Sequence, residues 1–281
     1  MQVITTKAEI RDAVRAWRSA GETVALTPTM GYLHAGHMAL VERAKAEGDR
    51  VVTTIFVNPT QFGPNEDLST YPRDAERDLA MLRDAGVDAV FMPEVAEVYA
   101  PGAQTIVETT ELAKMLIGKL RPGHFRGVAT VVTKLFNIVQ PDTACFGEKD
   151  YQQLCVIRQM VRDLDIPVRI VGVPTVREGD GLAMSSRNVR LTPEDRAAAV
   201  VLSRALFQAE EMARTGITAS RLRAWVAAHI QAEPRADLQS ADIRDAQTLQ
   251  SISGPLTAPA VILLAVRFGS VLLIDQRVVT P

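Results

Sequence analysis

The sequence predicts an α/β protein built on a doubly wound parallel sheet, followed by a smaller C-terminal α+β domain. Through about residue 175, short apolar strand patterns alternate with helical patterns, as in parallel sheets covered by helices on both faces. Past Pro174 this alternation ends, and two helical patterns precede two apolar strand patterns. We therefore expect two domains, residues 1–175 and 176–281, joined near Thr175.

The composition is that of an ordinary globular protein: 281 residues, 47% hydrophobic and 23% charged. A net charge of −2 gives no electrostatic reason to expect a nucleic-acid partner. Cys145 and Cys155 fit buried, reduced thiols better than a disulfide. The N-terminus lacks a signal-peptide pattern, and the longest apolar stretch, 259–273, is too short to span a bilayer. We expect a cytoplasmic location without a membrane partner.

Helix and strand signals follow one another along the first domain. Thr6-Lys7-Ala8-Glu9 is a capping box that predicts a helix to about Ala20, where Gly21 ends it. The strand patterns are short and apolar without clean alternation, as in strands buried on both faces. We expect strands at 24–26, 51–57, 89–92, 143–146 and 168–173, and helices at 38–45, 74–85, 128–139 and 151–164.

The second domain begins with a strong helix signal. Thr192 followed by Pro193 is an N-cap with proline at the first helical position, which predicts one long Ala-rich helix. A second helix is expected at 220–232. Strands are expected at 258–266 and 271–274, with Phe268-Gly269-Ser270 as a hairpin turn.

His34-Ala35-Gly36-His37 is the most informative local pattern of the chain. It lies between a strand and a helix, where free backbone N–H groups and the positive end of the helix dipole point at an anion. Two histidines three residues apart can face the same anion. The pattern favours a phosphate site, most simply for ATP. Ordinary structure and metal ligation remain alternatives, although a helical zinc pair usually has four-residue spacing.

Two polar segments of the first domain also fall where doubly wound sheets bind ligands. Asn58 and Gln61 follow a strand, and their amides both donate and accept, which suits a small polyhydroxy or carboxylate ligand. An Asn-Pro turn with a solvated glutamine is the alternative. The basic, glycine-rich segment 118–127 predicts either an anion-binding loop or a flexible one.

Two further segments carry phosphate-binding residue types. Lys149 follows a strand, where its point charge can meet phosphate oxygens, and Gln153 is expected on the same helix face. An exposed helix cap is the alternative. Ser185, Ser186 and Arg187 lie after the domain junction, in a loop that could close over a polyphosphate or be a solvated linker.

Together these segments closely resemble the pantothenate synthetase (pantoate–β-alanine ligase) family. The matching segments are 28–37, 56–62, 71–73, 121–125, 147–153 and 171–188, in the family's order and spacing. The likeness is dense through about Leu191 and thin beyond it. The resemblance implies a Rossmann-like domain that binds nucleotide and pantoate, a C-terminal lid domain and a homodimer. It also implies ATP-dependent condensation of (R)-pantoate with β-alanine through a pantoyl adenylate, releasing AMP and diphosphate, in coenzyme A biosynthesis.

The resemblance assigns site residues as well. It implies catalytic roles for His34, His37 and Lys149, with His37 as the proton donor. Pantoate would contact Gln61, Gln153, Asn58 and Arg121, and Gln61 would also meet β-alanine. ATP would be bound by Met30, Gly31, Tyr32, Leu33, His34, Ala35, Gly36, His37, Gly147, Glu148, Lys149, Asp150, Val176, Met184, Ser185, Ser186 and Arg187.

Mg²⁺ is expected with the polyphosphate, held mostly by phosphate oxygens and waters. No protein ligand of the ion is assigned. Asp78 is a weak candidate, since its neighbour Arg77 departs from the more acidic version of this segment in some family members.

Two other classes of function stay open at this point. A nucleotidyltransferase would share His34, His37 and the Ser185–Ser186 loop, but would not need the amides of Gln61 and Gln153. A nucleotide-binding regulatory or RNA-associated protein on the same fold is disfavoured by the histidine pair, by Lys149 and by the lack of basic excess.

Overall fold

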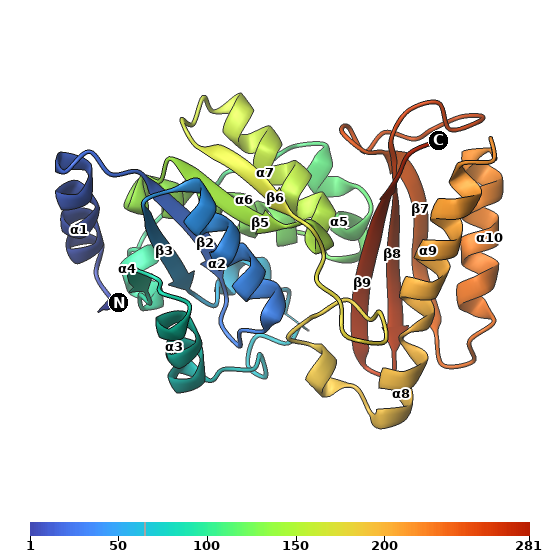
Figure 1. Cartoon of the computed structure of the whole chain (residues 1–281), viewed down its shortest axis with the longest axis horizontal. Coiled ribbons are helices and arrows are strands. Elements are labelled where there is room, and N and C mark those ends of the chain that lie inside the picture. Colours follow the sequence, from blue (N-terminus) through green and yellow to red (C-terminus); the bar gives the residue numbers. More distant parts are fainter. Residues whose placement is uncertain (65) are drawn as a thin grey trace. The chain divides into compact units, whose positions relative to one another are not determined.

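The computed structural model describes residues 1–64 and 66–281, which form two compact units. The first comprises Met1–Gly147 and Val156–Pro174, and the second comprises Glu148–Cys155 and Thr175–Pro281 (Figure 1). The short segment Glu148–Cys155 thus belongs to the second unit, although it precedes the boundary expected near Thr175. The functional division at that boundary stays a prediction.

A six-stranded parallel sheet forms the centre of the first unit. Its strand order is β1-β4-β3-β2-β5-β6, and every neighbouring pair is parallel. The predicted doubly wound sheet is therefore confirmed. The strands are β1 (Gln2–Ile4), β2 (Val24–Thr29), β3 (Arg50–Ile55), β4 (Ala89–Phe91), β5 (Thr143–Gly147) and β6 (Arg169–Val173).

Helices cover the sheet on both faces. Leu40 of α2 and Leu82 of α3 share one apolar cluster with Ala25 of β2, which places α2 and α3 on one face. Right-handed crossovers place α1, α6 and α7 on the other face. There α1 packs against α6. The helices of this unit are α1 (Lys7–Ser19), α2 (Ala35–Glu47), α3 (Ala75–Asp84), α4 (Val95–Val98), α5 (Ile117–Leu120), α6 (His124–Val139) and most of α7 (Tyr151–Asp163), with 3-10 turns η1 (Pro59–Gln61) and η2 (Leu112–Lys114).

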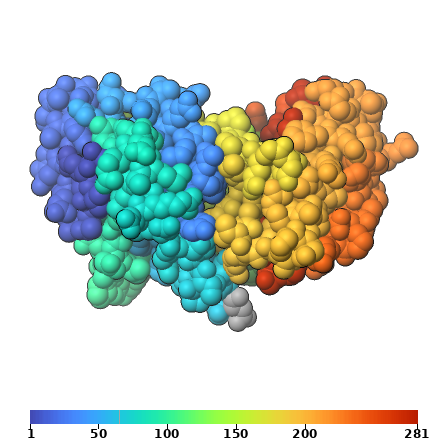
Figure 2. Space-filling model, turned by 60° about the horizontal axis from the view of Figure 1, so that its bottom comes forward, coloured from blue at the N-terminus to red at the C-terminus, as the bar shows by residue number. Residues whose placement is uncertain are grey.

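The topology marks one edge of this sheet for ligand binding. β2 and β5 are neighbours, but the chain leaves β2 toward β3 and leaves β5 toward β6, in opposite directions across the sheet. Such a switch point opens a crevice at the carboxyl ends of the two strands. Met30–His37 directly follow the carboxyl end of β2. Figure 2 shows one face of this unit, with residues 1–64 and 66–147 in blue to green and residues 156–174 in yellow-green.

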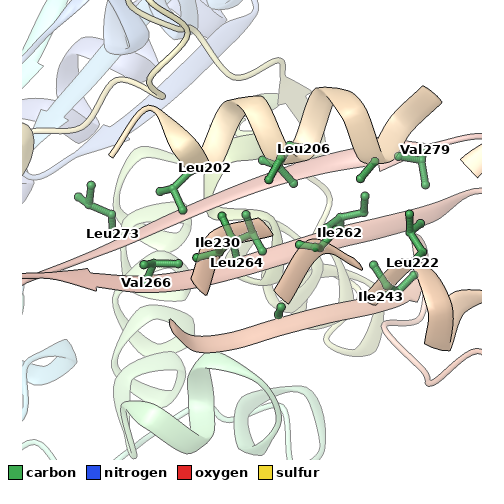
Figure 3. Packing of buried hydrophobic residues seen from close by; sticks show 14 of the residues in the cluster. Leu202, Leu206, Leu222, Ile230, Ile243, Ile262, Leu264, Val266, Leu273 and Val279 are labelled. Carbon is green, nitrogen blue, oxygen red and sulfur yellow. The ribbon is translucent and has the colours of Figure 1, made fainter. Parts of the chain in front are cut away.

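The second unit is a three-stranded antiparallel sheet with helices packed on it. β7 (Asp237–Asp245), β8 (Ala260–Phe268) and β9 (Val271–Val279) are ordered β7-β8-β9, and α9 (Val201–Ala213) and α10 (Ala219–Gln231) pack on the sheet. Leu206 of α9 and Ile230 of α10 meet Leu264 of β8 in the apolar core (Figure 3). α8 (Pro193–Ala198), η3 (Glu148–Asp150) and η4 (Asn188–Arg190) complete the unit. The predicted hairpin turn at Phe268-Gly269-Ser270 is confirmed, because β8 and β9 pair antiparallel on either side of it. Gly269 has φ +55° in this turn.

The single long helix expected from Pro193 is wrong, because the chain forms α8 and α9 with a turn between them. Ala199 and Val200 in that turn are both buried in the core of the unit. The Ala-rich composition favours helix, but it does not encode the turn that buries Ala199 and Val200 in this core.

The sequence patterns also missed strand residues that lack an apolar pattern and are stabilised by hydrogen bonds to a neighbouring strand. β1 is a three-residue edge strand, and the mostly polar β7 is held by its register with β8. β9 runs on to Val279, beyond the expected end at Ile274, because residues 275–279 pair with residues 260–264 of β8. α6 begins at His124 instead of Val128, so the segment 118–127 lies largely in α5 and α6.

The core of the second unit can be tested at Leu206, which is fully buried on α9. Leu206→Ala should lower the free energy of unfolding by about 2–5 kcal/mol, through lost burial and the cavity left behind. Gln208→Ala, at an exposed position of the same helix, is the matched control and should change little. Urea unfolding compares the two, and equal stabilities would contradict the packing.

Candidate active site

The turn after β2 is held in a strained form by one buried carboxylate. Gly31 has φ +82° and Tyr32 has φ +51°, a region that costs a non-glycine residue on the order of 1–3 kcal/mol. Asp78 of α3 is 1% exposed and accepts hydrogen bonds from the backbone N–H groups of Tyr32 and Leu33, each at 2.7 Å. A Cβ on Gly31 would lie 3.1 Å from Asp78 Oδ2, so this approach also needs glycine.

Arg77 reinforces this turn from the neighbouring position of α3. Its Nη2 donates to the carbonyl of Leu33 at 2.7 Å, and its guanidinium lies 5.2 Å from the centre of the Tyr32 ring. Asp78 thus accepts from the backbone N–H groups of Tyr32 and Leu33, and Arg77 donates to the backbone carbonyl of Leu33. The two carboxylate oxygens of Asp78 serve backbone N–H groups, which identifies it as a support of the turn.

His34 and His37 form a reciprocal cap at the N-terminus of α2. His34 Nδ1 accepts from the backbone N–H of Gly36 at 3.1 Å, and His37 Nδ1 accepts from the backbone N–H of His34 at 3.2 Å. Because Nδ1 accepts in both rings, the hydrogen of each neutral imidazole lies on Nε2. The ring centres are 4.1 Å apart, so the cap brings two N–H donors together beside a helix N-terminus.

Asn58 and Gln61 lie together after β3, in and beside the turn η1. Both are buried, and Asn58 Nδ2 donates to Gln61 Oε1 at 3.0 Å. Gln61 Nε2 lies 3.4 Å from Met30 Sδ, which joins this turn to the loop that follows β2. The structure therefore brings Gln61 beside Met30, as a shared site would require. Gly127 of α6 packs so closely that a Cβ there would lie 2.4 Å from the carbonyl oxygen of Thr60.

Arg121 is engaged with neighbouring side chains. Its Nε donates to Glu66 Oε1 at 2.8 Å, and its Nη1 lies 3.2 Å from His124 Nε2. Burial opposes ionisation of Glu66, but the hydrogen bond and charge of Arg121 outweigh it and hold the pKa of that carboxyl below its ordinary value. His124 Nδ1 in turn lies 2.9 Å from the carbonyl oxygen of Gln61. A substrate carboxylate would have to share Arg121 with Glu66.

The other predicted nucleotide residues lie mostly in the second unit. Lys149 is in η3, just before α7, with Nζ 3.8 Å from Asp150 Oδ2. The expectation that Lys149 and Gln153 share one α-helical face is wrong, because α7 begins only at Tyr151. Glu148 lies in the same 3-10 turn, whereas Gly147 ends β5 in the first unit.

The segment after Thr175 folds back on itself within the second unit. The backbone N–H of Met184 donates to the carbonyl of Val176 at 3.0 Å. Ser185 Oγ accepts from the backbone N–H of Arg187 at 3.2 Å, so Ser185, Ser186 and Arg187 form a tight turn. The turn thus gathers two hydroxyl groups and one guanidinium within three consecutive residues.

Two other kinds of site find little support among the described residues. No group of three or more His, Cys, Asp or Glu side chains within 1–64 and 66–281 could hold a metal ion. Cys145 is fully buried in β5, and burial raises the pKa of its thiol to about 11, far from that of a reactive thiolate.

The sequence model described as pantoate-beta-alanine ligase matches residues 2–278, almost the whole chain. The chain belongs to the pantoate–β-alanine ligase family. The pantothenate synthetase of Agrobacterium fabrum is 53% identical over 280 residues, covering 99% of this chain and 96% of that protein. As a member of this family the chain is an enzyme, an AMP-forming ligase that makes a C–N bond, and ATP is a substrate of the family.

Solved ligase structures agree with this assignment. The crystal structure of pantothenate synthetase from Thermus thermophilus has a TM-score of 0.95 and 50% identity, with both chains covered completely. The pantoate–β-alanine ligase from Francisella tularensis, complexed with beta-gamma ATP and β-alanine, has a TM-score of 0.81 and 35% identity over 99% of this chain and 97% of that one. Among the residues described here, no helix is long and apolar enough to cross a membrane.

Sequence reasoning missed several residues that support the candidate site. Tyr99 donates to Asn58, Glu66 pairs with Arg121, and Arg77 holds Leu33. None of them belongs to a local motif that contains its partner. The acidic residues near Asp78 are the one sequence signal for this region. They suggested a metal ligand, whereas Asp78 accepts hydrogen bonds from the turn.

The carboxylate of Asp78 offers a direct test of the turn. Asp78→Ala leaves the backbone N–H groups of Tyr32 and Leu33 without their acceptor, so we expect a loss of roughly 1–3 kcal/mol in stability. Affinity for ATP should also fall, because the turn leads into His34. Glu76→Ala, at an exposed position of the same helix turn, is the control. Urea unfolding measures the stability and titration with ATP measures the affinity. An Asp78→Ala protein with wild-type ATP affinity would contradict the supporting role.

Proposed function

We propose that this ligase joins (R)-pantoate to β-alanine in two steps, through a pantoyl adenylate. A carboxylate oxygen of pantoate attacks the α-phosphorus of ATP, and the bond to the β-phosphate breaks, releasing diphosphate. The amine of β-alanine then attacks the activated acyl carbon, a C–N bond forms, and AMP leaves with the acyl C–O electron pair. The first step is needed because a free carboxylate is a poor electrophile.

The paired caps of His34 and His37 carry this proposal. Growing negative charge on the departing diphosphate calls for preorganised N–H donors, and both imidazoles hold their hydrogen on Nε2. The N-terminus of α2 adds a favourable dipole at the same place. We assign both histidines to the phosphates and His37 to proton donation, as the family resemblance suggests. A covalent protein nucleophile is not part of this chemistry.

Gln61 is the proposed contact for both acyl and amine substrates. It is a buried carboxamide beside Met30, on the edge of the sheet that carries the histidine cap. Pantoate is also assigned to Gln153 and Arg121, whereas Asn58, which was predicted as a further pantoate contact, has both ends of its amide bonded within the protein. The Francisella tularensis relative, solved with beta-gamma ATP and β-alanine, supports the choice of nucleotide and amine.

The remaining assignments rest on the family resemblance. We propose that Lys149, Ser185, Ser186 and Arg187 bind ATP phosphates, with Gly147, Glu148, Asp150, Val176 and Met184 completing the nucleotide contacts. We also propose a lid role for residues 176–281, a homodimer and a cytoplasmic location. Mg²⁺ would accompany ATP on phosphate oxygens and water, and we assign it no protein ligand.

The two-step order predicts exchange of labelled diphosphate into ATP without β-alanine. Exchange should require (R)-pantoate and Mg²⁺, because reversal of adenylation needs the acyl adenylate. The measurement is label incorporation into ATP, with pantoate omitted as the control. Absence of exchange, together with no pantoyl adenylate in a single turnover, would exclude the intermediate.

His37→Gln separates the catalytic role of His37 from its role in the cap. Glutamine at this helix position can still accept from the backbone N–H of His34, so the cap is preserved. Without the imidazole we expect pantoate-dependent exchange to fall by about 100-fold or more. His229→Gln, a histidine of α10 stacked on Trp225, is the control. Near-normal exchange in a folded His37→Gln protein would remove His37 from the chemistry.

A further inference from the structure

The side chain of Asn58 is bound on every polar atom by groups of the protein. Nδ2 donates to the carbonyl oxygen of Gly127 at 3.1 Å and to Gln61 Oε1 at 3.0 Å. Oδ1 accepts from Tyr99 Oη at 2.8 Å, from Thr60 Oγ1 at 2.9 Å and from the backbone N–H of Thr60 at 3.3 Å. With 1% of its surface exposed, Asn58 is built into the wall of the site.

Two of these partners determine which end of the Asn58 amide is which. A backbone carbonyl can only accept, so the end facing Gly127 must be the NH₂ group. A backbone N–H can only donate, so the end facing Thr60 must be the oxygen. The reversed orientation would set donor against donor and acceptor against acceptor, and would leave buried polar groups without hydrogen-bond partners.

The orientation of Asn58 in turn determines that of Gln61. Asn58 presents an N–H to Gln61, so the carboxamide of Gln61 must turn its oxygen toward Asn58. Its NH₂ end then lies on the opposite side, where Nε2 is 3.4 Å from Met30 Sδ. Gln61 therefore offers hydrogen-bond donors on the side of the loop that follows β2.

Tyr99 completes the chain of hydrogen bonds. Its hydroxyl, at the C-terminal end of α4, lies 3.1 Å from Thr60 Oγ1 as well as 2.8 Å from Asn58 Oδ1. Burial raises the pKa of Tyr99, which keeps the proton on the hydroxyl and makes it a donor. Its ring packs near Phe56 and beneath the ammonium of Lys134, which holds the hydroxyl in place.

We propose that Tyr99 and Asn58 are positioning residues that hold Gln61 with its N–H end toward the substrate, so that Gln61 recognises a carboxylate or hydroxyl oxygen of the hydroxy acid. The inference rests on the proposed function of Gln61 in pantoate binding. Tyr99 acts through Asn58 and does not itself touch the substrate. The orientation of both amides follows from the carbonyl of Gly127, which can only accept, and the backbone N–H of Thr60, which can only donate.

Tyr99→Phe tests the relay by removing a single hydroxyl. We expect the KM for pantoate to rise about three- to tenfold, the worth of one neutral hydrogen bond, with kcat and the KM for ATP nearly unchanged. Thr133→Val is the matched control, because it removes a hydroxyl of the same unit that bonds the carbonyl of Ala129 and Met160 Sδ. All three KM values should stay at the wild-type level in that control.

A double-mutant cycle separates positioning from a general structural effect. In a Gln61→Ala background, Tyr99→Phe should no longer change the KM for pantoate, because the group it orients is gone. The relay is overturned if Tyr99→Phe has its full effect on the KM for pantoate in that background. It is also overturned if the KM values for all substrates and kcat change to the same extent.

Gln61→Glu tests the polarity itself. A glutamate can still accept from Asn58, but it faces the substrate with a charged acceptor in place of a donor. We expect the KM for pantoate to exceed that of Gln61→Ala. A KM closer to wild type than that of Gln61→Ala would mean that Gln61 presents its oxygen to the substrate, which would overturn the assignment.

These results also separate the inference from the function on which it rests. If the wild-type protein shows no pantoate-dependent activity, the proposed function fails. If it is active and Gln61→Ala raises the KM for pantoate, but Tyr99→Phe does not, only the relay fails.

Discussion

The site depends on one buried carboxylate, that of Asp78. Its two oxygens accept the backbone N–H groups of Tyr32 and Leu33, in a turn whose backbone is left-handed at Gly31 and Tyr32. Without that acceptor, two buried donors would lose their partners in a strained segment. The direction in which the chain enters α2, and hence the position of His34, follows from this contact.

Backbone groups also set the polarity of the side chains that follow. Both imidazoles at the start of α2 accept from backbone N–H groups through Nδ1, which leaves their hydrogens on Nε2. The carbonyl of Gly127 and the N–H of Thr60 similarly orient Asn58, and through it Gln61. An imidazole or an amide can be placed in two orientations that exchange its donor and acceptor atoms. In each case a backbone group that can only donate or only accept selects one of the two. A ligase that uses ATP benefits from donors that are fixed before its substrates bind.

The second unit uses a buried ion pair for a comparable purpose. Arg177 binds Asp275 of β9 through two hydrogen bonds of 2.7 and 3.0 Å, and its Nη1 also donates to the carbonyl of Gly181. Arg196 binds Glu178 and Asp180 in the same segment. A bidentate pair of this kind defines geometry more than it adds stability. Here it anchors the residues that lead into the Ser185–Arg187 turn to the sheet.

Local sequence determined most elements of the first unit and the family. Capping residues, glycines and runs of apolar residues mark the helices and strands because these signals act within a few residues, and the parallel sheet follows from their alternation. His34-Ala35-Gly36-His37 indicated an anion site for the same reason, since the cap and the helix dipole are local.

Tertiary structure decided the features whose partners lie far apart in the chain. Asp78 meets Tyr32 across 46 residues, and Tyr99 meets Asn58 across 41, so no motif contains both members of either pair. The polar strand β7 and the break between α8 and α9 arise from pairing and packing that local propensity does not encode. The candidate residues could be named from the sequence, but the orientation of the Asn58 and Gln61 amides could not. The Asn58 amide is oriented by the carbonyl of Gly127, which only the fold brings within hydrogen-bonding distance because it lies 69 residues away in the chain.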